Sequence, residues 1–259
     1  MSLYRILFLG DIVGKPGRNI VREGLPSLKD TYSPLFVIVN GENSAGGVGI
    51  TPDIADELFA QGVDGITLGN HAFNKKDIYD YLNSGRPIVR PANMPQSVPG
   101  RGCAVIRKDA IELSILNVCG RVFLEHYDDP FAAVDQLILE APSPHIMLDF
   151  HAEATSEKIA MGYHVDGRVT AMVGTHTHVT TADEQVLPGG TAYITDVGMC
   201  GPKGSVLGMD REIILQRFRT TLPAKFEVQN TPGVISGVTI DVERDTGRAI
   251  AIERIRFGL

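Results

Sequence analysis

The sequence predicts an α/β fold in which two mixed β-sheets pack face to face with helices on their outer sides, a four-layer αββα sandwich. In the first half of the chain, short apolar runs alternate with helical segments, as they do in a parallel α/β sheet. In the later half, strand-like runs predominate. No Pro/Gly/Ser-rich linker or run of charge separates the halves, so we expect a single domain over residues 1–259.

The first half alternates between predicted strands and predicted helices. Four apolar runs rich in β-branched and aromatic residues predict strands at residues 4–10, 35–41, 65–70 and 87–93. Helices are predicted at residues 17–30, 51–62 and 75–85. Thr51 suits the N-cap of the second helix, and Pro52 suits its first position. Pro26 is expected to disturb the first helix.

The later half contains mostly strands. The runs at 103–110 and 111–120 have little between them and predict a hairpin. Further strands are predicted at 145–150, 168–174 and 191–199, with a helical stretch between the first two. The last two strands, 233–242 and 248–257, are predicted to flank the turn at 243–247.

Composition excludes several classes of protein. The 259 residues carry a net charge of −7 without a Lys/Arg cluster, so we expect no stable nucleic-acid complex. The three cysteines form no C-x-x-C pair, which is typical of a reducing compartment. Asp11 interrupts the first apolar run, which is too short for a signal peptide or membrane span. We therefore expect a cytoplasmic protein without membrane association. The sequence leaves open whether it forms a homo-oligomer.

Polar residues with metal-binding chemistry follow five of the predicted strands. These residues are Asp11; Glu42 and Asn43; Asn70 and His71; His151; and His176 and His178. In open α/β sheets, ligands bind outside the carboxyl ends of the strands. The residues offer carboxylate, amide and imidazole groups but no thiolate, a set that suits iron, manganese or zinc. Seven or more ligands exceed the needs of one tetrahedral ion, whereas two ions sharing a bridging carboxylate would use them.

Each of these residues has a simpler explanation when it is considered alone. Asp11 could cap a turn, Glu42 could be a turn residue, and His151 could be a satisfied buried histidine. Their recurrence at five strand ends favours the metal site. His176 and His178 lie two residues apart, so as strand residues their side chains would share one face. The stretch GDIVGKPG lacks the spacing of a nucleotide-triphosphate loop, although Lys15 and Arg18 remain candidates for phosphate contact.

The ordered blocks GDIVG, NGEN, GNH, DFH and GTHTH resemble those of the calcineurin-like metallophosphoesterases. They resemble the YmdB-type branch more closely, which is similar to 2′,3′-cyclic-nucleotide 2′-phosphodiesterases. The family's usual Asp-x-His block is here Asp11-Ile12-Val13. Asn43 matches the residue that supplies the missing ligand in this branch, and Glu42 replaces the usual bridging Asp. The resemblance extends from Asp11 to about residue 210.

The resemblance implies a role for each residue of the set. One ion would be held by Asp11, Glu42, Asn43 and His178, and the other by Glu42, Asn70, His151 and His176. Glu42 would bridge two ions of iron, with manganese as the alternative. His71 would bind no metal and would act as the general acid. Asn74 stands where the family often has an acid, which places the tuning of His71 in question.

The implied activity is hydrolysis of the 2′-ester bond of 2′,3′-cyclic nucleotides to give 3′-nucleotides. A metal-bound hydroxide would attack the phosphorus, and His71 would protonate the leaving oxygen. Two alternatives use the same residues: a phosphomonoesterase or 5′-nucleotidase, and a regulatory protein that binds metal or nucleotide without turnover. The partner in each enzymatic case is a small cyclic nucleotide or another phosphate ester.

Overall fold

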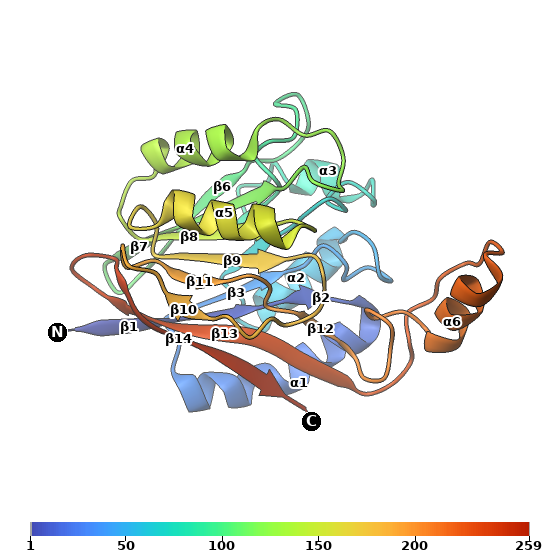
Figure 1. Ribbon diagram of the computed structural model, residues 1–259. Coiled ribbons are helices and arrows are strands. Elements are labelled where there is room, and N and C mark those ends of the chain that lie inside the picture. Colours follow the sequence, from blue (N-terminus) through green and yellow to red (C-terminus); the bar gives the residue numbers. More distant parts are fainter. Residues whose placement is uncertain (1, 259) are drawn as a thin grey trace.

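The computed structural model describes residues 2–258 and confirms the predicted sandwich: two mixed sheets pack together with helices on both outer faces (Figure 1). The first sheet has eight strands in the order β2-β12-β13-β1-β3-β4-β5, with β14 also paired to β13. Its strands are β1 (Leu3–Leu9), β2 (Asp11–Ile12), β3 (Phe36–Asn40), β4 (Gly65–Thr67), β5 (Ile88–Val89), β12 (Met199–Pro202), β13 (Gly233–Glu243) and β14 (Ala249–Phe257).

The second sheet has six strands in the order β10-β11-β9-β8-β7-β6. They are β6 (Cys103–Lys108), β7 (Ile111–Cys119), β8 (Ile146–His151), β9 (Ala171–Thr175), β10 (Gln185–Val186) and β11 (Ala192–Ile194). β7, β8, β9 and β11 run parallel, whereas β6 and β10 are antiparallel to their neighbours. In the first sheet, β1, β3, β4 and β5 run parallel to one another. β13 is antiparallel to β1, β12 and β14, whereas β2 pairs with β12 in parallel.

The helices supply the outer layers. They are α1 (Gly14–Tyr32), α2 (Pro52–Ala60), α3 (Ile78–Tyr81), α4 (Pro130–Glu140), α5 (Thr155–Val165) and α6 (Arg211–Thr220). α1 and α2 share a buried cluster with the first sheet, and α4 and α5 share another with the second. In Figure 1, α6 projects away from the sandwich. None of the helices within residues 2–258 is both long and apolar enough to cross a membrane.

The alternation of side chains along the strands creates the three apolar layers. In β1, Ile6 and Phe8 belong to the cluster between the sheets, while Leu7 and Leu9 belong to the cluster under α1 and α2. All four side chains have no exposed surface. A central strand of this kind is buried on both faces, which explains why it reads as an unbroken apolar run.

The carboxyl ends of the parallel strands in the two sheets meet at one edge of the sandwich. Asp149 of β8 accepts hydrogen bonds from Asn40 of β3 at 3.0 Å and from Thr67 of β4 at 2.5 Å. All three side chains are fully buried. Because buried polar groups are stabilised only when they are paired, this contact fixes the two sheets at the edge where the predicted site residues follow.

Three predicted elements differ from the structure. α1 continues through Pro26 to Tyr32, because Val21, Leu25 and Leu28 bury an apolar face on the sheet. The helix predicted at 75–85 is reduced to the single turn of α3. The strand predicted at 191–199 is two strands, β11 and β12, which belong to different sheets. The chain crosses between the sheets at Gly198, whose φ of 78° favours glycine.

Two helices were not predicted, and both begin with a recognisable cap. Asp129 precedes α4 and accepts from the N–H of Phe131, with Pro130 at the first helical position. Asp210 precedes α6 and accepts from the N–H groups of the second and third helical residues. An aspartate before a helix satisfies N–H groups that have no partner within the helix.

Candidate metal centre

The predicted site residues all lie at the edge where the two sheets meet. Asp11 lies in β2 after a one-residue break from β1, and His151 is the last residue of β8. The loops after β3, β4 and β9 carry the remaining residues, which are Glu42 and Asn43, Asn70 and His71, and His176 and His178. Asp11, Glu42, Asn43 and His151 are buried, and the other four are half-buried.

Four atoms with lone pairs that could bind a metal ion, called donor atoms below, form a cluster that consists of Nε2 of His151 and three atoms around it. This nitrogen lies 2.9 Å from Oδ1 of Asn70, 3.1 Å from Oε1 of Glu42 and 3.1 Å from Nδ1 of His176. The donor atoms of Glu42, His151 and His176 all lie within 4.8 Å of one another. Residues from three different loops and one strand end are thus brought into direct contact.

A chain of hydrogen bonds fixes the tautomer of His151. The hydroxyl of Thr175 donates its one proton to Asp149 at 2.7 Å, so it can only accept from Nδ1 of His151, which lies 2.8 Å away. The proton of the neutral imidazole is therefore on Nδ1. The lone pair of Nε2 points toward Glu42 and Asn70.

The rings of His176 and His178 are oriented in a similar way. Nε2 of His176 lies 3.2 Å from a carboxylate oxygen of Glu153, which places the proton on Nε2 and leaves the Nδ1 lone pair toward His151. Nδ1 of His178 donates to the carbonyl oxygen of Leu207 at 3.0 Å, which leaves Nε2 free. Each of the three histidines thus has one nitrogen held by the protein and one available to a ligand.

This arrangement fits a bound cation. Two imidazole lone pairs, an amide oxygen and a carboxylate oxygen face one another at hydrogen-bonding distance, and a single proton could serve only one pair of them at a time. A metal ion would accept electrons from all four. Gly69 lies against the cluster, since a Cβ there would lie 2.4 Å from Oε2 of Glu42 and from Nε2 of His151. The absence of a side chain at residue 69 leaves the space that the donors need.

Two buried oxygens next to this cluster have no hydrogen-bond partner within residues 2–258. They are Oδ1 of Asp11 and Oδ1 of Asn43. The other oxygen of Asp11 accepts from the backbone N–H of His176 at 3.2 Å, and the amide nitrogen of Asn43 donates to the carbonyl of Gly47 at 3.0 Å. Both side chains are therefore held with one oxygen unused. An unpaired buried oxygen is costly, and a metal ion would satisfy it.

The charged groups of the site shift one another's pKa values. Burial acts to raise the pKa of Glu42, but the nearby His151 and His71 outweigh it and lower the pKa to about 2. Burial acts to lower the pKa of His151, but Glu42, Asp11 and Asp149 raise it to about 9. The carboxylate thus attracts positive charge to this point, as a proton or as a metal ion.

Asp11 and His176 respond mainly to burial. Burial raises the pKa of Asp11 to about 7, although His178 and His151 act in the opposite direction. Burial and the charge of His151 lower the pKa of His176 to about 3. His176 is therefore in its neutral, ligand-competent form at neutral pH.

His71 lies beside the four-donor cluster without forming part of it. Its backbone N–H donates to Oε2 of Glu42 at 3.0 Å, and its Nε2 lies 3.4 Å from the amide nitrogen of Asn70. The ring is half-buried. Asn74, where the family often has an acid, donates only its backbone N–H to the carbonyl of His71, at 3.1 Å, among the described hydrogen bonds.

The loop after β9 does not place its histidines in the predicted way. β9 ends at Thr175, so His176 and His178 do not alternate along a strand. Their φ angles are 101° and 65°, in the left-handed region that non-glycine residues rarely adopt. Such a conformation costs about 1–3 kcal/mol and persists only where the surroundings enforce it. The prediction of a shared strand face was therefore wrong.

The surroundings include a buried ion pair that was not predicted. Nζ of Lys158 lies 2.7 Å from Asp196, and both side chains are fully buried. Lys158 also donates to the carbonyl of Thr175 at 2.8 Å, and Asp196 accepts from the N–H of Thr177 at 3.1 Å. The pair thereby holds the loop on both sides of His176. Asp149, Thr175 and Glu153 were also not identified, although each lies within two residues of a predicted ligand.

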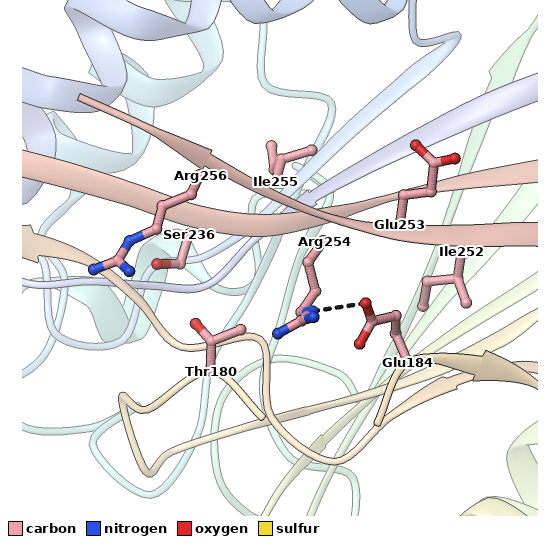
Figure 2. A pocket seen from close by; sticks show the side chains of 8 residues that line it. All are labelled: Thr180, Glu184, Ser236, Ile252, Glu253, Arg254, Ile255 and Arg256. Atoms are coloured by element: carbon pink, nitrogen blue, oxygen red, sulfur yellow. Dashed lines mark hydrogen bonds and ion pairs between the residues drawn. The ribbon is translucent and has the colours of Figure 1, made fainter. Parts of the chain in front are cut away.

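The candidates for phosphate contact do not join the site. Arg18 donates to the carbonyl of Ser44 at 2.7 Å and lies 3.6 Å from Glu57. Lys15 lines a separate hollow beside Asn19 and Glu23. Another hollow, of about 480 Å³, lies between β14 and the loop before β10, and it contains the Arg254–Glu184 ion pair but none of the predicted site residues (Figure 2).

Comparisons with known proteins show similarity over nearly the whole chain. A family model described as a YmdB-like protein matches residues 7–255. The chain is 53% identical over 253 residues to the 2′,3′-cyclic-nucleotide 2′-phosphodiesterase of Bacillus subtilis (strain 168), covering 97% of this chain and 96% of that protein. The sequence blocks of this chain that carry the candidate ligands therefore lie within a match over nearly the whole chain.

Solved structures show the same fold. A hypothetical protein from Thermus thermophilus has a TM-score of 0.92 and 40% identity, with 98% of each chain covered. A phosphatase from Mycoplasma pneumoniae has a TM-score of 0.93 and 39% identity, covering 99% of this chain and 94% of that one. The NAD nucleotidase of Haemophilus influenzae, at 14% identity and a TM-score of 0.58, shares the fold alone; the match covers 98% of this chain and 56% of that one.

Proposed function

The chain belongs to the YmdB-like family, and from that premise we propose that it is a metal-dependent phosphodiesterase acting on 2′,3′-cyclic nucleotides. It cleaves the 2′-ester bond and releases 3′-nucleotides. The substrate is a small diffusible molecule, and the protein acts as a single domain over residues 1–259 in the cytoplasm. The name of the B. subtilis relative supports the choice of substrate.

The observation that carries the proposal is the convergence of three donor atoms on a fourth, Nε2 of His151. We assign one ion to Glu42, Asn70, His151 and His176, and a second to Asp11, Asn43, His178 and the shared Glu42. The donors are oxygen and nitrogen atoms, which suits iron or manganese. The two unpaired oxygens of Asp11 and Asn43 support the second set.

Two ions bound here would neutralise the phosphate and activate the attacking water. The remaining chemistry belongs to the chain. His71 is next to Asn70 and half-exposed, so its ring can reach an oxygen of a phosphate held at the donors. There it donates a proton to the departing 2′-oxygen of the ribose. Glu42, by accepting the N–H of His71, fixes the position of this residue relative to the donors.

A substrate panel tests this function. Protein loaded with Mn²⁺ is given cyclic 2′,3′-nucleotides, 3′- and 5′-nucleotides, bis-p-nitrophenyl phosphate and p-nitrophenyl phosphate, and the products are separated by chromatography. We expect cyclic substrates to give 3′-nucleotides without further release of phosphate. Preferred hydrolysis of monoesters would instead support a phosphomonoesterase. This is the second candidate, because the chain is similar to a protein described as a phosphatase. Metal and nucleotide binding without turnover would indicate a regulatory protein.

A further inference from the structure

A cavity of about 400 Å³ adjoins the metal centre on the side of Asn70. It is lined by Asn70, Phe73, Asn74, Met94, Pro95, Val98, Glu125 and Tyr127. Asn70 belongs to both features, since its Oδ1 lies 2.9 Å from Nε2 of His151. A ligand held at the donors therefore has a hollow directly beside it.

The cavity has apolar and aromatic walls. Phe73, Val98 and Tyr127 are half-buried and pack against the cluster beneath α1 and α2, and Met94 is 6% exposed. Phe73 meets Tyr79 edge to face, with ring centroids 5.4 Å apart. Walls of this kind suit a flat apolar group, because aromatic rings stack favourably on one another.

The aromatic walls are held in place by hydrogen bonds. Phe73 lies in the same tight turn as His71, which is closed by the bond from the N–H of Asn74 to the carbonyl of His71. The loop that carries Tyr127 is attached to Asn93, whose amide donates to the carbonyls of Cys119 at 2.8 Å and Asp128 at 3.0 Å. The cavity and His71 therefore form one fixed unit.

The polar groups of the cavity limit the chemistry of its ligand. Glu125 is exposed and receives a hydrogen bond from the hydroxyl of Tyr127 at 3.5 Å. An ionised carboxylate accepts hydrogen bonds and repels phosphate, so this cavity does not suit a second phosphate group. The uncharged amide of Asn74 can both donate and accept. A flat ring whose edge carries N–H groups satisfies these conditions.

We infer that this cavity is the nucleobase subsite and that it takes a purine, with guanine preferred. The base stacks on Phe73 and Tyr127, and its two adjacent N–H groups donate to Glu125. The inference rests on the proposed function for the identity of the substrate. It also explains the position of His71: with the phosphate at the donors and the base beyond Asn70, the ribose lies next to His71.

The test compares a substrate that has a base with one that lacks it. The wild-type protein, loaded with Mn²⁺, is given guanosine 2′,3′-cyclic phosphate and methyl ribofuranoside 2′,3′-cyclic phosphate. Stacking of a base on a protein ring strengthens binding by a factor of about 5 or more. The kcat/KM of the guanosine substrate should therefore exceed that of the base-free substrate by at least this factor. Tyr127→Leu and Phe73→Leu should remove most of this preference by raising KM for the guanosine substrate.

Phe131→Leu is the matched control, because Phe131 is also half-buried and aromatic but packs on the other outer layer of the sandwich. Glu125→Gln should lower the preference for guanosine over inosine 2′,3′-cyclic phosphate about 3- to 10-fold, since inosine lacks the 2-amino group. Glu253→Gln, an exposed acid on β14, is its control. An unchanged ratio in Glu125→Gln would remove this residue from the subsite.

Calorimetric binding of guanosine 3′-monophosphate gives a readout that needs no turnover. If the wild type cleaves no cyclic phosphate but Tyr127→Leu still weakens binding fivefold or more, the proposed function fails and the subsite stands. If the wild type cleaves both substrates with equal kcat/KM and neither aromatic variant weakens binding, the subsite fails and the proposed function stands.

Discussion

The two halves of the candidate metal centre differ in how completely the protein has formed them. In the half that consists of Glu42, Asn70, His151 and His176, which we call the converged half, the donors already touch at 2.9–3.1 Å. In the half that consists of Asp11, Asn43 and His178, the open half, no such convergence is seen among the described contacts. Instead Asp11 and Asn43 each keep an unpaired oxygen.

The difference follows from the elements that support each half. In the converged half, His151 ends a central strand and is held through Thr175 to the buried Asp149, which also joins the two sheets. In the open half, His178 depends on the carbonyl of Leu207, an exposed residue with a φ of 52°. A ligand supported by the core loses little freedom on binding a metal, whereas a ligand supported by an exposed segment must still be ordered. We therefore expect the converged half to bind its ion more tightly.

The largest effect is expected at Glu42, because this residue is shared by both halves. Glu42→Gln keeps the shape of the shared ligand but removes its charge, so both ions should be lost and activity abolished. Circular dichroism should show a retained fold, because Glu42 lies in a loop rather than within a sheet. Glu140→Gln, an exposed acid on α4, is the control. A Glu42→Gln protein that retains both ions by elemental analysis would show that this carboxylate does not bridge them.

The next largest effect is expected at His71 and concerns catalysis, not metal binding. His71→Ala should keep both ions, because the His71 ring lies outside the four-donor cluster. It should lower kcat on a cyclic nucleotide about 10²- to 10⁴-fold, since the ribose oxygen needs a proton to depart. Bis-p-nitrophenyl phosphate has a better leaving group and should be much less affected. Equal losses on the two substrates, or loss of an ion, would assign His71 to binding.

A smaller effect is expected at Thr175, which holds His151 of the converged half in place. Thr175→Val removes the hydroxyl that sets the tautomer of His151, and it leaves Asp149 without one of its donors. We expect about 10- to 100-fold weaker binding of the ion in the converged half, measured by competition with a chelator. Thr177→Val, in the same loop, should have little effect because, in the described part of the chain, its hydroxyl bonds only within that loop. Equal weakening by both substitutions would point to a general loss of loop order.

The smallest effect is expected in the open half. Asn43→Ala removes the unpaired buried oxygen and should weaken only the ion of this half, by about tenfold. The converged half should keep its affinity, because none of its described contacts involves Asn43. Measurement of both affinities in one chelator titration checks this. An unchanged weaker affinity would place Asn43 outside the ligand set.

The sequence predicted the position of the site because the signal for it is local. A buried parallel strand reads as an apolar run, and the residue that follows it lies at the carboxyl edge whatever the rest of the fold does. This is why Asp11, Glu42 and His151 could be placed before the structure was known. Apolar runs with only a short turn between them likewise predicted the hairpin of β6 and β7 and the final pair β13 and β14.

The sequence could not give the contacts that distinguish the two halves. Asp149 bonds with Asn40, 109 residues away, and Lys158 pairs with Asp196, 38 residues away, so neither partner is visible locally. The left-handed backbone of His176 is enforced by such long-range contacts, and alternation along a strand therefore gave the wrong geometry. The helices α4 and α6 were accessible from their capping aspartates but were not recognised.

The metal content of the chain tests most directly whether it binds two ions, with the converged half preformed. Titration of chelator-treated protein with Mn²⁺, followed by the EPR signal of the free ion, measures the number and affinity of the sites together. We predict two ions per chain in the wild type, the first bound at least about tenfold more tightly, and one tightly bound ion in His178→Ala. A single ion in the wild type, or loss of the tightly bound ion in His178→Ala, would contradict the account.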